Sequence, residues 1–160
     1  MTEQTDKPIQ SEFERLMGHK LQRIAELYKM TDQLDEKNSV DLQEKLTIYG
    51  DIFEIFGDLE AFAVGKAKLN YAHRKEVNAN TYLTKTKNKD GTRTLTSKER
   101  ESVAELSTRH YRRLEAEYEH EAKKWQNRRE SILEQINIMK RKQDAIGNLW
   151  EKANYINGHG

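Results

Sequence analysis

The chain has 160 residues, of which 35% are hydrophobic and 34% are charged, with a formal net charge of +1 and a mean hydropathy of −1.02. This composition is too lean for a wide compact core, and it favours long helices with narrow apolar seams or subunits that complete each other's core. Absence of cysteine excludes disulfide and thiolate chemistry. No apolar run reaches about 18 residues and no charged-then-apolar leader is present, so we expect a soluble cytoplasmic protein without a membrane partner. If a phage encodes the chain, the compartment is the host cytoplasm.

Charge is unevenly distributed along the chain. Residues 1–60 carry 7 basic and 14 acidic side chains, a net charge of −7, whereas residues 61–160 carry 21 and 13, a net charge of +8. Between Lys66 and Lys98 nine basic side chains stand against two acidic ones, a local charge of +7. This excess indicates a surface that binds an anion, or oppositely charged patches that neutralise each other between neighbouring subunits.

The first predicted helix covers residues 12–34. Residues 1–10 are polar, contain Pro8 and lack periodicity, which predicts a disordered tail. Ser11 and Glu14 have the spacing of a capping box, and apolar residues then recur every three or four positions. We expect one helical domain over 11–157, followed by a flexible tail over 158–160.

The second predicted helix covers residues 40–80 and has two apolar stripes instead of one. A helix that is apolar on two faces must be covered on two faces, so we expect it at the centre of a bundle. Gly50 and Gly57 lie seven residues apart on this helix. Because glycine inside a helix is unfavourable, they predict a close approach by a neighbouring helix.

Residues 81–96 break the helical period. Threonine recurs at alternate positions around Asp90 and Gly91, which predicts a short β-hairpin or a basic loop. The alternate positions between the threonines would present Lys85, Lys87 and Lys89.

A third helix is predicted over 97–156, opened by a capping box at Thr96 and Glu99. Its seven-residue repeat predicts left-handed supercoiling, with a kink or break near residues 126–129 or at Gly147. The predicted fold is therefore an all-α, elongated antiparallel helical bundle or coiled coil with three main helices that forms a homo-oligomer. The predicted oligomer interface comprises Tyr111, Tyr118, Trp125, Ile132, Met139 and Ile146, together with Phe53 and Phe56.

The local charge excess defines the predicted binding site for a polyanion, of which single-stranded DNA is the favoured case. No nucleotide-binding, nucleophile–base or metal-ligand arrangement is recognisable; Glu117 and His120 match one half of a di-iron motif, without the second half that this chemistry needs. We therefore expect neither an enzyme nor a cofactor or metal. The predicted nucleic-acid-binding residues are Lys66, Lys68, Arg74, Lys75, Lys85, Lys87, Lys89, Arg93 and Lys98.

Over residues 38–160 the order of features resembles the phage recombination-mediator family of the UvsY type. The features are Asn38-Ser-Val-Asp-Leu-Gln before Ile48-Tyr49, a basic segment ending in Thr81-Tyr-Leu-Thr84, Ser131-Ile-Leu-Glu-Gln-Ile-Asn-Ile-Met-Lys-Arg141, and Gln143-Asp-Ala-Ile146 before Trp150. The resemblance implies a small helical protein that assembles into rings. It also implies that the protein helps to load a RecA-like recombinase onto single-stranded DNA coated with single-strand binding protein. Helix 12–34, the basic turn around 85–93 and the uncharged residues 77–80 depart from the family pattern.

Two functions are therefore predicted. The first is an oligomeric single-stranded-DNA-binding accessory protein that acts in recombination. The alternative is a non-enzymatic interaction protein, either a phage scaffold or adaptor or an inhibitor of a host complex, and it is suggested by the acidic first third of the chain and by helix 12–34.

Overall fold

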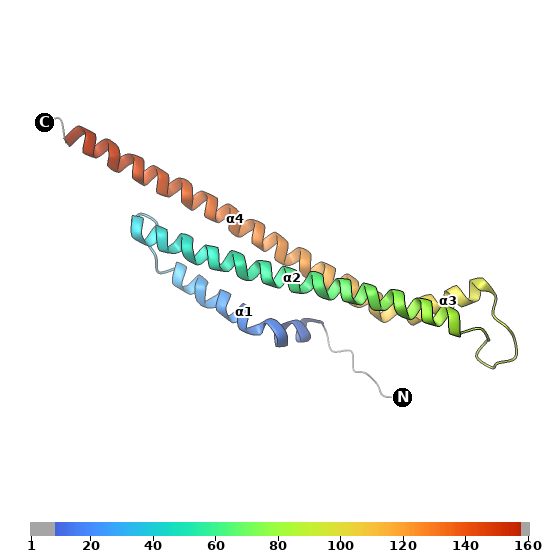
Figure 1. The fold of residues 1–160 in the computed structure, drawn as a ribbon. Helices are drawn as coiled ribbons and strands as arrows, with labels where there is room; N and C mark the ends of the chain where they lie inside the picture. Colours follow the sequence, from blue (N-terminus) through green and yellow to red (C-terminus); the bar gives the residue numbers. More distant parts are fainter. Residues whose placement is uncertain (1–8, 158–160) are drawn as a thin grey trace. The chain divides into compact units, whose positions relative to one another are not determined.

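A computed structural model describes the backbone of residues 9–157 and the side chains of residues 12–149. The described residues form four helices, α1 (Ile9–Thr31), α2 (Ser39–Thr84), α3 (Ser97–Ser107) and α4 (Arg109–Asn157) (Figure 1). The predicted all-α class is confirmed, and the packing of the helices is compatible with a bundle. The predicted tail over 158–160 and most of the tail over 1–10 lie outside the described residues.

The chain forms two compact units. Unit 1 comprises residues 1–59 and 124–160, and unit 2 comprises residues 60–123. Helices α2 and α4 each contribute a segment to both units. The predicted single helical domain over 11–157 stays a prediction.

Helix α1 begins at Ile9, so the last two residues of the predicted tail are helical and Ser11 lies inside the helix. The capping box predicted at Ser11 is therefore wrong.

The turn between α1 and α2 is closed by side chains that accept backbone hydrogen bonds: Asn38 Oδ1 accepts from the amide of Val40 at 2.9 Å, and Asp41 Oδ2 accepts from that of Asp35 at 3.0 Å. Asn38 thus caps α2.

Three aromatic rings from three helices form the centre of unit 1. The Trp125 ring of α4 stacks on Phe13 of α1, with ring centroids 5.7 Å apart, and on Phe56 of α2 at 5.8 Å. Figure 1 shows α1 running beside the amino-terminal part of α2. Helix α1 also contacts α2 directly, through the edge-to-face pair of Tyr28 and Tyr49 with ring centroids 6.4 Å apart. The other apolar side chains buried in unit 1 are Ile24, Leu27, Leu42, Ile48, Ile52, Leu59, Ile132 and Met139.

An ion-pair cluster closes unit 1 near the turn that precedes α2. The Glu36 carboxylate accepts from Lys45 Nζ of α2 at 2.9 Å and also from Lys142 Nζ of α4. Hydrogen bonds from these two ammonium groups lower the pKa of Glu36 from its ordinary value of 4.5 to about 2. The turn is thereby attached to two helices by one carboxylate.

The predicted third helix is two helices, because the chain breaks at Thr108. Ser107 Oγ donates to the carbonyl of Ala104 at 2.6 Å, and Thr108 Oγ1 donates to that of Glu105 at 2.9 Å. Such side chains compete with the backbone for helical carbonyls, and Thr108 itself ends α3 with φ −97° and ψ −3°. The break predicted at residues 126–129 or at Gly147 is wrong, since α4 is continuous through both.

The aromatic and apolar residues that recur every seven positions in α4 are packed within a single chain. Tyr118, Trp125, Ile132 and Met139 are buried, as is Phe56. The remaining residues of the predicted oligomer interface, Tyr111, Ile146 and Phe53, are half-buried. The predicted interface stays a prediction, but most of its side chains are already covered without a second copy.

Within the described chain no neighbouring helix approaches Gly50 or Gly57 closely. A methyl group added at Gly50 would meet nothing within 4 Å, and one at Gly57 would meet only the Arg129 side chain, at 3.7 Å. Gly91 is different, because its φ of +71° lies in the left-handed region.

We expect Trp125→Ala to lower the free energy of unfolding by about 3–5 kcal/mol, because the ring is shared by all three helices of unit 1. Urea denaturation followed by circular dichroism measures this change. Leu133→Ala on the same helix is the matched control, since Leu133 is 45% exposed and should change stability by less than about 0.5 kcal/mol. Equal effects of both changes would contradict the central role of the stack.

We expect Gly50→Ala to raise the free energy of unfolding by about 0.8–1 kcal/mol, because alanine favours the helix and the added methyl meets open space. Gly91→Ala should lower it by about 1–2 kcal/mol, because a left-handed conformation is unfavourable for alanine. Thermal and urea unfolding of the two variants test whether the free energy of unfolding changes in opposite directions. A destabilising Gly50→Ala would show that a neighbour not present in the structure approaches this face of α2.

Candidate nucleic-acid interface

All nine predicted nucleic-acid-binding residues belong to unit 2. They occupy the second part of α2, the connection over residues 85–96 and the start of α3. Seven are exposed, whereas Lys66 and Arg74 are half-buried. The exposed residues are Lys68, Lys75, Lys85, Lys87, Lys89, Arg93 and Lys98.

The connection over residues 85–96 is organised by Asn88. The Gly91 amide donates to the Asn88 carbonyl at 3.0 Å, which closes a four-residue turn with Asn and Gly at the positions that such turns favour. Asn88 Oδ1 also accepts from the Arg93 amide at 3.1 Å. In the part of the chain that the structure describes, the predicted hairpin amounts to one isolated antiparallel bridge, between Lys87 and Thr94.

Both ends of this connection are attached to helices. The Arg100 guanidinium of α3 donates to the Tyr82 carbonyl through Nε at 2.9 Å and through a second nitrogen, and it lies over the Tyr82 ring at 4.3 Å. Tyr82 Oη lies 3.2 Å from Ser97 Oγ, within hydrogen-bonding distance. Contacts of Tyr82 with Arg100 and Ser97 therefore join the end of α2 to the start of α3.

The capping box predicted at the start of α3 is confirmed. Glu99 accepts from the Thr96 amide at 2.9 Å, and the Glu99 amide donates to Thr96 Oγ1 at 3.3 Å. Arg93 joins this motif by donating to both Glu99 oxygens, at 2.7 and 3.0 Å. These bonds, led by that from Arg93, lower the pKa of Glu99 from its ordinary value of 4.5 to about 2.

Two predicted site residues are therefore committed to contacts within the chain. Arg93 is paired with Glu99, and Arg74 donates through Nε to Glu115 of α4 at 2.8 Å. The Glu115 side chain is 15% exposed, so the Arg74 pair is partly shielded from water. Removal of either arginine would leave a carboxylate without its partner, and the change would perturb structure as well as charge.

The lysines keep their charge available for a ligand. Among the residues that the structure describes, the lysines at six positions of the predicted site make no ion pair: Lys68, Lys75, Lys85, Lys87, Lys89 and Lys98. The Lys66 ammonium lies over the Phe62 ring at 5.7 Å and is less accessible. The arrangement presents several mobile cations on a connection whose shape is maintained by other side chains.

Three residues with a role in this region were not part of the sequence prediction. Asn88 and Arg100 order the connection, and Tyr71 is exposed on α2. The signal for Tyr71 was its position between two lysines on one helix face, three residues after Lys68 and four before Lys75. Asn88 and Gly91 had a local signal, the spacing of a four-residue turn, whereas Arg100 had none, since its partner Tyr82 lies 18 residues away.

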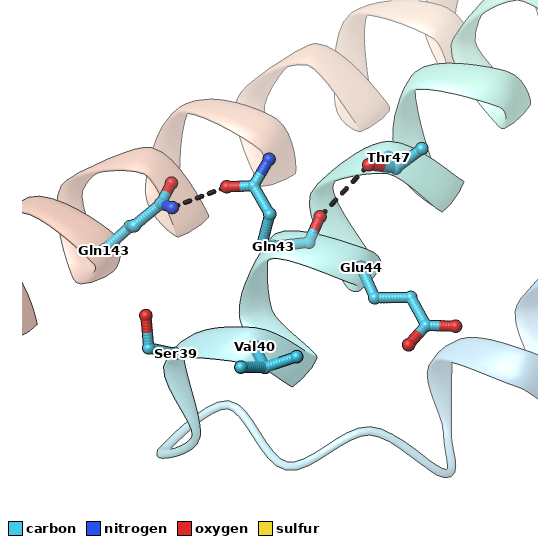
Figure 2. A pocket seen from close by; sticks show the side chains of 6 residues that line it. All are labelled: Ser39, Val40, Gln43, Glu44, Thr47 and Gln143. Atoms are coloured by element: carbon cyan, nitrogen blue, oxygen red, sulfur yellow. Dashed lines mark hydrogen bonds between the residues drawn. The ribbon is translucent and has the colours of Figure 1, made fainter.

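A pocket in unit 1 has mostly polar lining residues. It is lined by Ser39, Val40, Gln43, Glu44, Thr47 and Gln143. Figure 2 shows that Gln43 and Gln143 face each other, and the amide of Gln143 donates to Gln43 Oε1 at 2.5 Å. Glu44 is the only ionisable side chain of the six.

The described residues contain no cluster of three or more side chains able to hold a metal ion. No helix within them is long and apolar enough to span a membrane.

Comparisons with protein-family models, with curated proteins and with solved structures found no match for this chain.

We expect Arg93→Gln to raise the pKa of Glu99 from about 2 towards its ordinary value of 4.5, since the largest cause of the lowering is removed. A lowered pKa means that the interaction contributes to stability above about pH 4.5 and that this contribution is lost as the pH falls through about 2. A carbon-detected NMR titration of the Glu99 carboxyl measures both values.

Lys98→Gln is the control for this titration, because it removes a neighbouring charge that does not contact Glu99. The pKa of Glu99 should stay low in this variant. A similar rise in both variants would mean that the general field, and not the Arg93 pair, lowers the pKa.

Proposed function

We propose that the chain is a non-enzymatic accessory protein that binds single-stranded DNA, or another polyanion, through the lysines of unit 2. The observation that carries this proposal is the set of six lysines without ion pairs, three of which project from the connection over residues 85–96. Several lysines that converge on one phosphate backbone give binding without sequence preference, because each releases a bound counterion.

The organisation of the connection supports the proposal. Asn88, Arg93 and Arg100 determine its shape, and none of the three central lysines takes part in those contacts. The lysines can therefore reorient towards phosphates while the backbone keeps its conformation. A partly ordered surface loses less conformational entropy on binding than a disordered one.

We further propose that the protein acts as a homo-oligomer in recombination. This step depends on the resemblance to the UvsY-type family, which implies a RecA-like recombinase and a single-strand binding protein as partners. An oligomer would present several copies of the lysine set to one strand, which raises the overall affinity without any new contact.

The interaction-protein alternative is favoured by one observation, the net charge of −7 on residues 1–60. The apolar residues of α1 do not support it, because Phe13, Ile24 and Leu27 are buried in unit 1. A partner of α1 would therefore contact its exposed polar face. This alternative predicts no binding of nucleic acid by the intact chain.

We expect a single strand of about 30 nucleotides to bind with a log affinity that falls with log salt at a slope of roughly −3.5, if about five phosphates are neutralised. Changing Lys85, Lys87 and Lys89 to Ser should weaken binding and reduce the steepness of the slope by about 2. Fluorescence anisotropy at several salt concentrations measures both. Arg93 is left unchanged so that the capping box stays intact.

The matched control changes Lys29, Lys37 and Lys140 to Ser, which removes the same charge from exposed lysines of unit 1. This variant should bind like the wild type. Equal weakening by the two triple variants would indicate a response to net charge alone, and absence of binding by the wild type would favour the protein-interaction alternative.

A further inference from the structure

Tyr71 is an exposed aromatic residue on the basic part of α2. Its side chain is 46% exposed, although the neighbouring turns of the same helix bury Ala67 and Asn70. Phe62 and Tyr118, in contrast, make an aromatic contact inside unit 2, with ring centroids 6.5 Å apart. Packing of unit 2 therefore accounts for those two rings and leaves much of the Tyr71 ring in water.

Basic and aromatic side chains share one face of this helix. Lys68, Tyr71, Lys75 and Tyr82 are separated by three, four and seven residues, spacings that place them in one row along the helix surface. From Tyr71 to Tyr82 this row covers about 16 Å at a rise of about 1.5 Å per residue. The row ends where the chain enters the connection that carries Lys85, Lys87 and Lys89, so a single strand could follow both.

The two cations at the Tyr71 ring differ in mobility. The Arg74 guanidinium lies 5.1 Å from the ring centroid and is fixed by its bond to Glu115 at 2.8 Å. The Lys75 ammonium lies 5.6 Å from the same centroid and has no ion pair within the described chain. Arg74 can therefore hold the ring in position, whereas Lys75 can move to a phosphate.

We propose that Tyr71 is a stacking platform for an unpaired nucleobase, with Lys68 and Lys75 contacting the adjacent phosphates. This inference rests on the proposed function and narrows its ligand to single-stranded nucleic acid. Bases of a single strand can stack on an exposed ring beside lysines, and each such stack contributes enough to be measured by alanine substitution. Bases inside a duplex have both faces covered by their neighbours, and inorganic polyphosphate has no bases.

The test compares the intact chain with Tyr71→Ala and Tyr71→Phe in binding to a single strand, to duplex DNA of the same length and to inorganic polyphosphate. We expect Tyr71→Ala to weaken single-strand binding about 5- to 150-fold, the equivalent of the 1–3 kcal/mol typical of one stacked base. Tyr71→Phe should bind like the wild type, because it keeps the ring. Binding of polyphosphate should be equal in all three proteins.

An abasic single strand provides a second readout. The affinity of the wild type for the abasic strand should be about as low as that of Tyr71→Ala for the normal strand. The affinity of Tyr71→Ala itself should fall little further when the bases are removed. Leu69→Ala is the matched control, since Leu69 is an apolar neighbour that is 50% exposed and should not affect binding. Thermal unfolding of each variant checks that the fold is retained.

The outcomes separate this inference from the proposed function. If Tyr71→Ala binds the single strand like the wild type, or weakens binding of polyphosphate equally, the stacking platform is wrong and the lysine site is kept. If the wild type binds none of the three polyanions, both proposals are wrong.

Discussion

The stack of Trp125 between Phe13 and Phe56 is the contact on which unit 1 depends, because one ring joins three helices. Each aromatic side chain of this kind buries about 150–250 Å². That gain outweighs a local cost, since Trp125 Nε1 is buried without a hydrogen-bond partner in the described chain, at about 1–3 kcal/mol. Helix α1 is part of this core, since Phe13, Ile24 and Leu27 are all buried.

Unit 2 is held together differently. Apart from Tyr118, its described buried side chains are small: Ala63, Ala67, Asn70, Ala104 and Thr108. Aromatic contacts such as Phe62 with Tyr118 add to this packing, as do arginine contacts, of Arg74 with Glu115, Arg93 with Glu99 and Arg100 with the Tyr82 carbonyl. A planar guanidinium suits such paired hydrogen bonds better than an ammonium group does.

This use of arginine divides the basic residues of unit 2 by role. Arg93 and Arg100 maintain the connection over residues 85–96 and Arg74 joins α2 to α4, whereas the exposed lysines of the predicted site make no ion pair within the described chain. A lysine ammonium is a mobile point charge that can follow an irregular phosphate backbone. The division explains how a region with a local charge of +7 can be ordered without losing its charge excess.

The sequence by itself determined the features that depend on neighbouring residues. Helical periodicity established the all-α class, and the pair Thr96 and Glu99 marked the start of α3 because both partners lie within one turn. The tertiary structure alone decided which residues are used up in long-range contacts. The pairing of Arg74 with Glu115, 41 residues away, is known only from the fold, as is the burial of Tyr118, Trp125, Ile132 and Met139 within a single chain. The break at Thr108 was also missed, since a Ser-Thr pair can lie inside a helix or end it, and the packing around it decides.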